Sequence, residues 1–266
     1  MRTALLTTTA AMILAAPGPA TADALGDAIA GDQRSAENRS RDPWRHPRET
    51  LEFFGFAPDQ TVVELWPGGG WYTEILAPAL HDDGNLVLAT LGEAEPDSYR
   101  TRSHRQFVAK LKSDPDTYGK ATTIDFWPPE STSLGAAGSA DLVVTFRNTH
   151  SMLRRNQFDA FLAAAFDVLK SGGTLGIVQH RGNPGSDVKD AARTGYVPEA
   201  LVVEKATAAG FVLAGRSEIN ANPKDTKDHP EGVWTLPPGY HLGDKDRAKY
   251  AAIGESDRMT LRFSKP

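Results

Sequence analysis

Short apolar runs alternate with amphipathic stretches along most of the chain. Residues 61–65 and 141–146 are apolar runs of strand length, typical of strands that are buried on both faces. The clearest helical pattern covers residues 156–170, where apolar side chains recur every three or four positions in one stripe. The same alternation predicts further strands at 85–91, 121–126, 173–179, 211–219 and 258–263, and helices at 48–54, 71–78, 99–111 and 198–209.

Strands that alternate with helices require crossover connections between neighbouring strands. We therefore predict an α/β fold with a doubly wound, mostly parallel sheet of seven strands and helices on both faces. A long polar loop at 220–257 precedes the last strand. This loop either selects a substrate or packs against the final strand.

The N-terminus has the pattern of an export signal. Arg2 precedes an apolar run at 4–16, and small residues follow at 20–22. The run is shorter than the roughly 20 apolar residues that span a membrane. We expect a cleavable signal at 1–22, a periplasmic or secreted protein, and no stable membrane anchor after cleavage; the alternative is an Ala-rich tail. A polar arm follows at 23–47. We expect its first part, up to about residue 42, to be a mobile arm or an irregular helix, and its segment 41–47 either covers the site as a lid or stays solvated.

Composition restricts the chemistry. The chain has no cysteine, which excludes disulfides, thiolate nucleophiles and Cys-based zinc sites. The seven histidines show no metal-ligand spacing, so no metal is assigned. The formal net charge is −5, and removal of Arg2 with the signal makes it −6, which argues against a nucleic-acid partner.

Three consecutive glycines follow the first predicted strand. Ligands of open parallel sheets bind beyond the carboxyl ends of the strands, and glycines there allow the backbone to approach a ligand closely. A dinucleotide fingerprint requires a further Gly or Ala after Gly68 and Gly70, where this chain has Thr73. This mismatch argues against a nicotinamide-dependent oxidoreductase.

The pattern Glu64-x-Trp66-x-Gly68-x-Gly70 resembles the first motif of class I S-adenosylmethionine-dependent methyltransferases, with Trp66 in the place of a glycine. The resemblance covers nearly all of 48–266 and implies a Rossmann-like sheet with an antiparallel last strand. It also implies S-adenosylmethionine as cofactor, with Glu64, Trp66, Gly68 and Gly70 at its amino-acid end. Alternatively, Trp66 is only a packing residue.

More narrowly, the chain resembles an uncharacterised group of exported predicted methyltransferases. The resemblance is carried by three runs, at 146–150, 180–181 and 232–238. These runs say nothing about the substrate.

The resemblance implies four further cofactor positions. Thr90 or the displaced Glu93 takes the place of the acid that binds the ribose hydroxyls after the second strand. Asp125 occupies the position that accepts the adenine amino group, and Phe126 packs on the ring. The alternative for Asp125 is a turn or helix cap.

The residues after the fourth and fifth strands are candidates for acting on a substrate. His150 and His180 are suited to proton transfer near neutral pH. Arg147, Asn148 and Arg181 are assigned to substrate binding, since arginine pairs well with a carboxylate or phosphate. The alternatives are structural histidines, and arginines in salt bridges.

Together these features predict methyl transfer to an unidentified small-molecule acceptor. The alternative is a protein that binds S-adenosylmethionine or S-adenosylhomocysteine without catalysis. The substitution of Trp66 for glycine and the missing ribose acid motivate that alternative.

Overall fold

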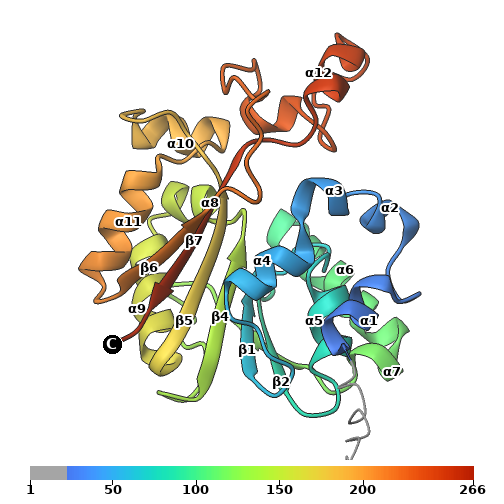
Figure 1. Ribbon diagram of the computed structural model, residues 1–266, viewed down its shortest axis with the longest axis vertical. Helices are drawn as coiled ribbons and strands as arrows, with labels where there is room; N and C mark the ends of the chain where they lie inside the picture. Colours follow the sequence, from blue (N-terminus) through green and yellow to red (C-terminus); the bar gives the residue numbers. More distant parts are fainter. Residues whose placement is uncertain (1–22) are drawn as a thin grey trace, which may run out of the picture.

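The computed structural model describes residues 23–266, and the predicted signal at 1–22 lies outside the described residues. A seven-stranded sheet runs through the centre of the molecule (Figure 1). Its strands are β1 (Thr61–Leu65), β2 (Asn85–Thr90), β3 (Thr122–Asp125), β4 (Ala140–Phe146), β5 (Leu169–His180), β6 (Val212–Ser217) and β7 (Arg258–Ser264).

The strand order is β3-β2-β1-β4-β5-β7-β6. The pairs among β3, β2, β1, β4 and β5 are parallel, and β7 runs antiparallel between β5 and β6. This arrangement confirms the predicted α/β fold with an antiparallel last strand. The carboxyl ends of β1, β4 and β5 consequently lie side by side at one edge.

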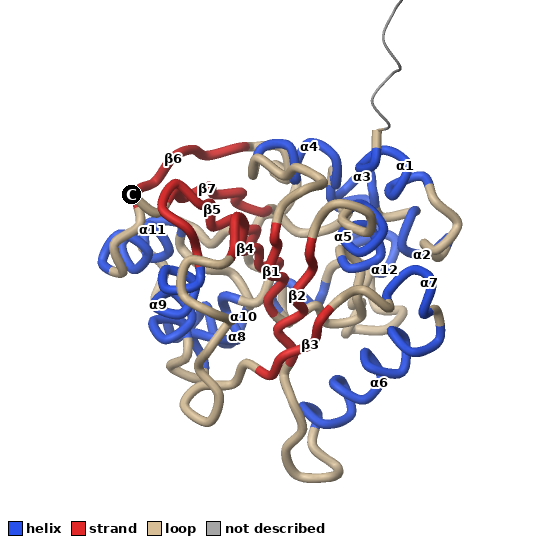
Figure 2. The backbone as a smooth tube through the Cα atoms, turned by 90° about the horizontal axis from the view of Figure 1, so that it is seen from below, coloured by secondary structure: helices blue, strands red, loops and turns tan. Residues whose placement is uncertain are grey.

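Helices cover both faces of the sheet (Figure 2). One face packs against α4 (Pro47–Phe53), α5 (Thr73–Ala79), α6 (Tyr99–Ser113) and α7 (Pro115–Tyr118), and the other against α8 (Thr149–Arg154), α9 (Phe158–Val168), α10 (Val188–Thr194) and α11 (Glu199–Ala208). Neighbouring strand residues alternate between the two cores: Val62 belongs to the first and Val63 to the second. Each face therefore has its own apolar core.

The arm at 23–47 is folded into short helices, which corresponds to the irregular-helix alternative and not to a mobile arm. It forms α1 (Ala24–Ala30), α2 (Ala36–Arg39) and α3 (Asp42–Arg45). Leu25 and Ala28 of α1 join the apolar core over α5. The buried Arg34 pairs with Asp42 at 2.7 Å, and Trp71 donates its indole N–H to the Asn38 carbonyl. The Arg34–Asp42 pair links residues within the arm, whereas the contacts of Leu25, Ala28 and Trp71 hold the arm on the sheet domain.

The long loop at 220–257 is packed as well. It contains the 3-10 helix η1 (Gly232–Thr235) and α12 (Arg247–Ile253), above the carboxyl edge of the sheet in Figure 1. The buried carboxylate of Asp225 accepts hydrogen bonds from the Tyr196 hydroxyl and the Asp257 backbone N–H, and it contacts the His229 ring at 2.9 Å. The start of the loop is therefore fixed in place by internal hydrogen bonds.

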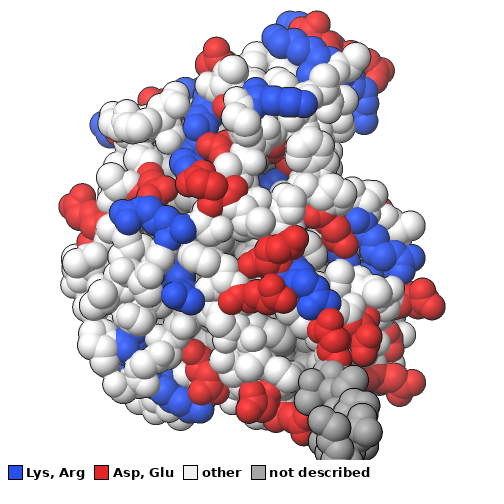
Figure 3. Space-filling view, viewed as in Figure 1, with Lys and Arg blue, Asp and Glu red and all other residues white. Residues whose placement is uncertain are grey.

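Charged side chains of both signs are interspersed over the face shown in Figure 3. Within residues 23–266, no helix combines the length and the hydropathy needed to cross a membrane.

Candidate functional site

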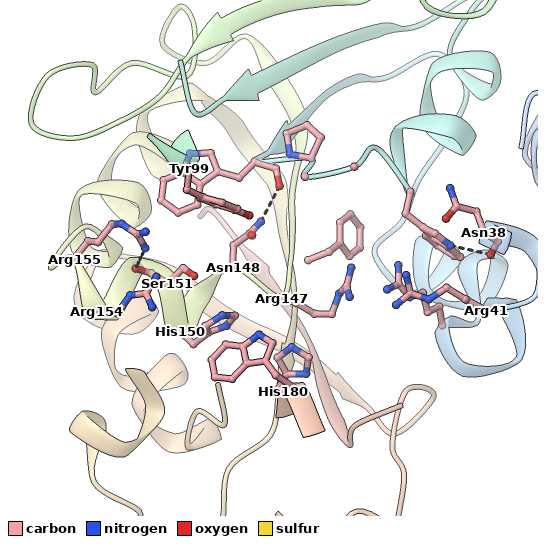
Figure 4. A pocket seen from close by; sticks show the side chains of 18 residues that line it. Asn38, Arg41, Tyr99, Arg147, Asn148, His150, Ser151, Arg154, Arg155 and His180 are labelled. Atoms are coloured by element: carbon pink, nitrogen blue, oxygen red, sulfur yellow. Dashed lines mark hydrogen bonds between the residues drawn. The ribbon is translucent and has the colours of Figure 1, made fainter. Parts of the chain in front are cut away.

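A cavity of about 620 Å³ lies at the carboxyl edge of the sheet (Figure 4). Six segments line it: the turn after β1, the residues after β4 with α8, the end of β5, the N-terminal arm, Tyr99 of α6, and Trp234 of η1. A second hollow of about 300 Å³ adjoins it and shares Trp66, Gly68, Tyr99, Asn148, Ser151 and Arg155. The two hollows have the size of a small-molecule site.

The turn after β1 has positive φ at alternate positions: 46° at Trp66, 62° at Gly68 and 79° at Gly70. Glycine adopts such angles freely, but a tryptophan is strained there. Hydrogen bonds hold Trp66 in place, from its backbone N–H to the Ala89 carbonyl at 2.8 Å and from its indole N–H to the Phe126 carbonyl at 2.9 Å. Gly68 faces open space, so the turn presents bare backbone to the cavity.

Glu64 lies beneath this turn and does not line the cavity. Its buried carboxylate accepts a hydrogen bond of 2.6 Å from the Thr73 hydroxyl at the start of α5. Burial raises the pKa of Glu64 to about 7. Glu64, which the family resemblance assigns to cofactor binding, thus connects β1 to α5 through this hydrogen bond.

The residues that the resemblance assigns to the nucleoside end of the cofactor do not line one common cavity. Thr90 borders a small recess next to Trp66 and Gly68, and its hydroxyl donates to the Asp125 carboxylate at 3.0 Å. Asp125 opens on a separate surface hollow, and Glu93 pairs with Arg105 of α6 on the surface.

Phe126 is fully buried in the core against Phe161, so its ring does not reach the cavity. Aromatic rings do border the adjoining hollow, but they belong to Trp66, Tyr99 and Trp127. After β3, the ring that borders a hollow is therefore that of Trp127 and not that of Phe126.

Arg147 and Asn148 follow β4 at the centre of the site, and the structure brings both into the cavity lining. Arg147 has a φ of 63°, and its backbone N–H donates to the Val178 carbonyl at 2.7 Å. The Asn148 side-chain amide donates to the carbonyls of Leu65 and Trp66 at 3.0 and 3.1 Å. Asn148 therefore fixes the end of β1 relative to the end of β4.

His150 and His180 lie together at the bottom of the cavity in Figure 4, with ring centroids 5.8 Å apart. Burial lowers the pKa of His150 to about 4 and that of His180 well below its usual range. Both rings are therefore uncharged at neutral pH.

Gln179 determines which nitrogen of His150 carries the proton. Its Oε1 accepts from the Thr149 backbone N–H at 3.1 Å, and its Nε2 donates to the Gly195 carbonyl at 2.8 Å, which fixes the orientation of the amide. Nε2 also lies 3.3 Å from Nδ1 of His150, so Nδ1 accepts a hydrogen bond. His150 thus carries its proton on Nε2 and acts as a hydrogen-bond donor.

The environment of His180 is different. Its Nδ1 lies 2.5 Å from the Ser256 hydroxyl, which can donate or accept. When His180 donates from Nδ1, its Nε2 has a free lone pair. In that tautomer His180 is a hydrogen-bond acceptor at Nε2, whereas its strongly lowered pKa makes it a weak base.

Arg181 does not line the cavity. It pairs with Glu218 at 2.6 Å and lies 3.4 Å from the Asp257 carboxylate. For Arg181 the structure therefore shows the salt-bridge alternative and not a substrate contact.

The arm supplies residues that the sequence analysis did not assign to the site. Asn38, Arg41 and Arg45 line the arm side of the cavity. Gln179 and the pair Arg154 and Arg155 were also missed. In the sequence, Arg41 and Arg45 were marked only by their place in the segment proposed as a lid. Gln179 was marked only by its place at the end of a predicted strand. Within residues 23–266, no group of three or more acidic or histidine side chains is arranged to hold a metal ion.

The strand order and this cavity can be compared with known proteins. No family model and no curated protein matches the chain. Among solved structures, a SAM-dependent methyltransferase from Aquifex aeolicus has a TM-score of 0.53 at 16% identity, over 68% of this chain and 87% of that chain. The chain has the methyltransferase fold.

Two other structures with this fold show its functional range. Phosphoethanolamine N-methyltransferase 2 from Haemonchus contortus, in complex with S-adenosyl-L-methionine, has a TM-score of 0.56 at 15% identity, over 91% of this chain and 56% of that chain. The [4+2]-cyclase SpnF has a TM-score of 0.57 at 16% identity, over 89% and 85%. At such identities the similarity establishes the fold, while the chemistry has to be argued from the site.

Proposed function

We propose that the protein binds S-adenosylmethionine at the turn after β1 and transfers its methyl group to a small-molecule acceptor. The observation that carries this proposal is the cavity that joins Gly68 and Gly69 to the histidines after β4 and β5. The residues fit the cofactor: the glycine turn offers backbone, Trp66, Tyr99 and Trp127 offer aromatic surface, and the arm offers guanidinium groups.

The bound cofactor would supply a methyl group activated by its positive sulfur. The contribution of the chain is mainly to align the acceptor and to exclude water, which can account for much of the rate enhancement of such a reaction. His150 would orient the acceptor through its Nε2–H. His180 would accept a hydrogen bond from the acceptor when the acceptor is a hydroxyl.

Calorimetry with S-adenosylmethionine tests the proposal. We expect wild type to bind it and Gly68→Asp to lose binding, because the new side chain enters the cavity at a φ of 62°. Gly138→Asp is a matched control, since Gly138 has a φ of 65° and also faces open space but lies before β4, outside the cavity. Wild type without a heat of binding, or equal loss in both variants, would contradict the proposal.

The second candidate is a protein that binds the cofactor without catalysis. It is favoured by the strained Trp66 in a glycine position and by the outward-facing Glu93. A mass-spectrometric screen of candidate acceptors separates the two: any methylated product excludes this alternative.

A further inference from the structure

Arg45 is buried in the wall of the cavity, and two of its three guanidinium nitrogens have no hydrogen-bond partner in the described part of the chain. Its side chain is 1% exposed, and its Nε lies 3.3 Å from the Glu255 carboxylate. Its Nη1 and Nη2 atoms have no hydrogen-bond partner within residues 23–266. A buried guanidinium with two unused donor atoms is costly unless something in the cavity accepts those hydrogen bonds.

Further guanidinium groups surround Arg45. Arg41 pairs through Nε with Glu255 at 2.6 Å, while its Nη2 is buried without a partner in the described part of the chain. Arg258 also pairs with Glu255. Arg147 lines the same cavity and makes no ion pair within residues 23–266.

The charges at this end of the cavity therefore do not balance. Within residues 23–266, four guanidinium groups gather around one carboxylate, Glu255, and the other titratable neighbours, Tyr72, His150 and His180, are neutral. Burial, with the nearby Arg258 and Arg41, lowers the pKa of Arg147 to about 10, so Arg147 stays cationic at neutral pH. This excess of positive charge lies inside a protein whose net charge is −5.

The site is also held in a fixed shape. The guanidinium of Arg45 lies 4.7 Å from the centre of the Trp71 ring, and its Nε is held by Glu255. A guanidinium that is stacked and bonded on one edge directs its remaining N–H groups in one direction, which suits an anion with two or more oxygens.

We propose that Arg45 and Arg147, assisted by Arg41, form an anion-binding site at the arm end of the cavity, which takes the carboxylate or phosphate group of a small molecule. That group is either the acid group of the methyl acceptor or the carboxylate of the cofactor. Only the choice between these two sources rests on the proposed function.

Inorganic phosphate is the first probe, in calorimetry and in thermal unfolding against chloride at equal ionic strength. We expect phosphate to bind and to raise the Tm of wild type. Binding should weaken at least tenfold in Arg45→Met and in Arg147→Met, which keep much of the side-chain volume. Arg154→Met is the matched control, because the exposed Arg154 lines the other end of the same cavity.

The proposal is overturned if wild type responds to phosphate no more than to chloride, or if the two methionine variants respond as wild type does. Loss of binding only in Arg154→Met also overturns it. Circular dichroism confirms that each variant is folded. Arg147→Lys, which keeps the charge, should retain part of the binding, and this distinguishes charge recognition from a packing defect.

A competition titration of the phosphate-loaded protein with S-adenosylmethionine shows whether the site takes the anionic group of the cofactor or that of the acceptor. Competition by S-adenosylmethionine, but not by 5′-methylthioadenosine, which lacks the amino-acid end, assigns the site to the cofactor carboxylate. Binding of S-adenosylmethionine at unchanged affinity assigns it to the acceptor. Phosphate binding without any binding of S-adenosylmethionine would sustain the anion site and refute the proposed function.

Discussion

Individual residues at the ends of β1 and β4 adopt backbone conformations that their side chains disfavour. Trp66 and Arg147 both have positive φ, which costs about 1–2 kcal/mol per residue. Each follows a strand directly and lines the cavity. Hydrogen bonds to neighbouring strands hold both backbones, so the sheet stabilises a turn geometry that these residues would not adopt alone.

Glu64 shows how a single buried group affects stability. Its pKa of about 7 in the folded chain lies above the ordinary value of 4.5, so the folded state binds its proton more tightly than the unfolded state. Its contribution to stability therefore falls as the pH rises from 4.5 to 7.

Glu64→Gln removes this pH dependence and keeps an oxygen to accept from Thr73. Relative to wild type, the free energy of unfolding of the variant should rise by about 3 kcal/mol between pH 4.5 and pH 8, measured by urea unfolding. Glu93→Gln, at an exposed carboxylate, should show no such rise. A constant difference between Glu64→Gln and wild type at both pH values would contradict the prediction.

At the scale of elements, the arm and the segment before β7 form one unit through Glu255. Arg41 and Arg45 come from the arm, while Glu255 and Arg258 lie more than 200 positions further along the chain. Although burial opposes it, the guanidinium groups of Arg258 and Arg45 lower the pKa of Glu255 to about 2. The carboxylate is therefore charged at any pH near neutral.

Glu255→Gln should release the arm. It leaves buried guanidinium groups without a counter-charge, a change that typically costs 3–5 kcal/mol. Trypsin should then cleave faster at Arg39 and Arg41 than in wild type, as followed by mass spectrometry. Glu218→Gln is the control, because Glu218 also pairs with an arginine at 2.6 Å but is 68% exposed, where such pairs contribute little. Equal cleavage in the two variants would show that Glu255 does not hold the arm.

At the scale of the whole molecule, the first described residue is part of the fold. Asp23 caps α1 by accepting from the Gly26 backbone N–H, and it pairs with Arg48 at 2.7 Å. A signal peptidase that cuts after Ala22 would retain this cap, whereas a cut after Ala24 would remove it.

We therefore propose that the exported protein begins at Asp23. N-terminal sequencing of protein recovered from the periplasm or medium of an expressing bacterium should read Asp23-Ala24-Leu25. Recovery of the uncleaved chain from the cytoplasm would refute both the signal and the location. Asp23→Ala, which lacks the cap, should unfold at a lower urea concentration than wild type.

The hydrophobic pattern by itself determined the strands, the major helices, the α/β class and the glycine turn. These features follow from neighbours along the chain: burial on both faces produces continuous apolar runs, and one-sided burial produces a stripe. The pattern also brought Arg147, Asn148, His150 and His180 to one edge, because parallel strands end together. It overlooked α8 and α10, which are too short to show a clear period.

Only the tertiary structure decided the composition of the site. Whether Glu64 and Phe126 face a ligand or the core depends on what packs over them, and Arg181 is neutralised by Glu218 and Asp257 of the long loop. Arg45 became a binding residue because folding buried it beside a cavity with one carboxylate for several arginines. Such long-range charge balance leaves no local pattern in a sequence, since Glu255 lies 214 positions from Arg41 and 210 positions from Arg45.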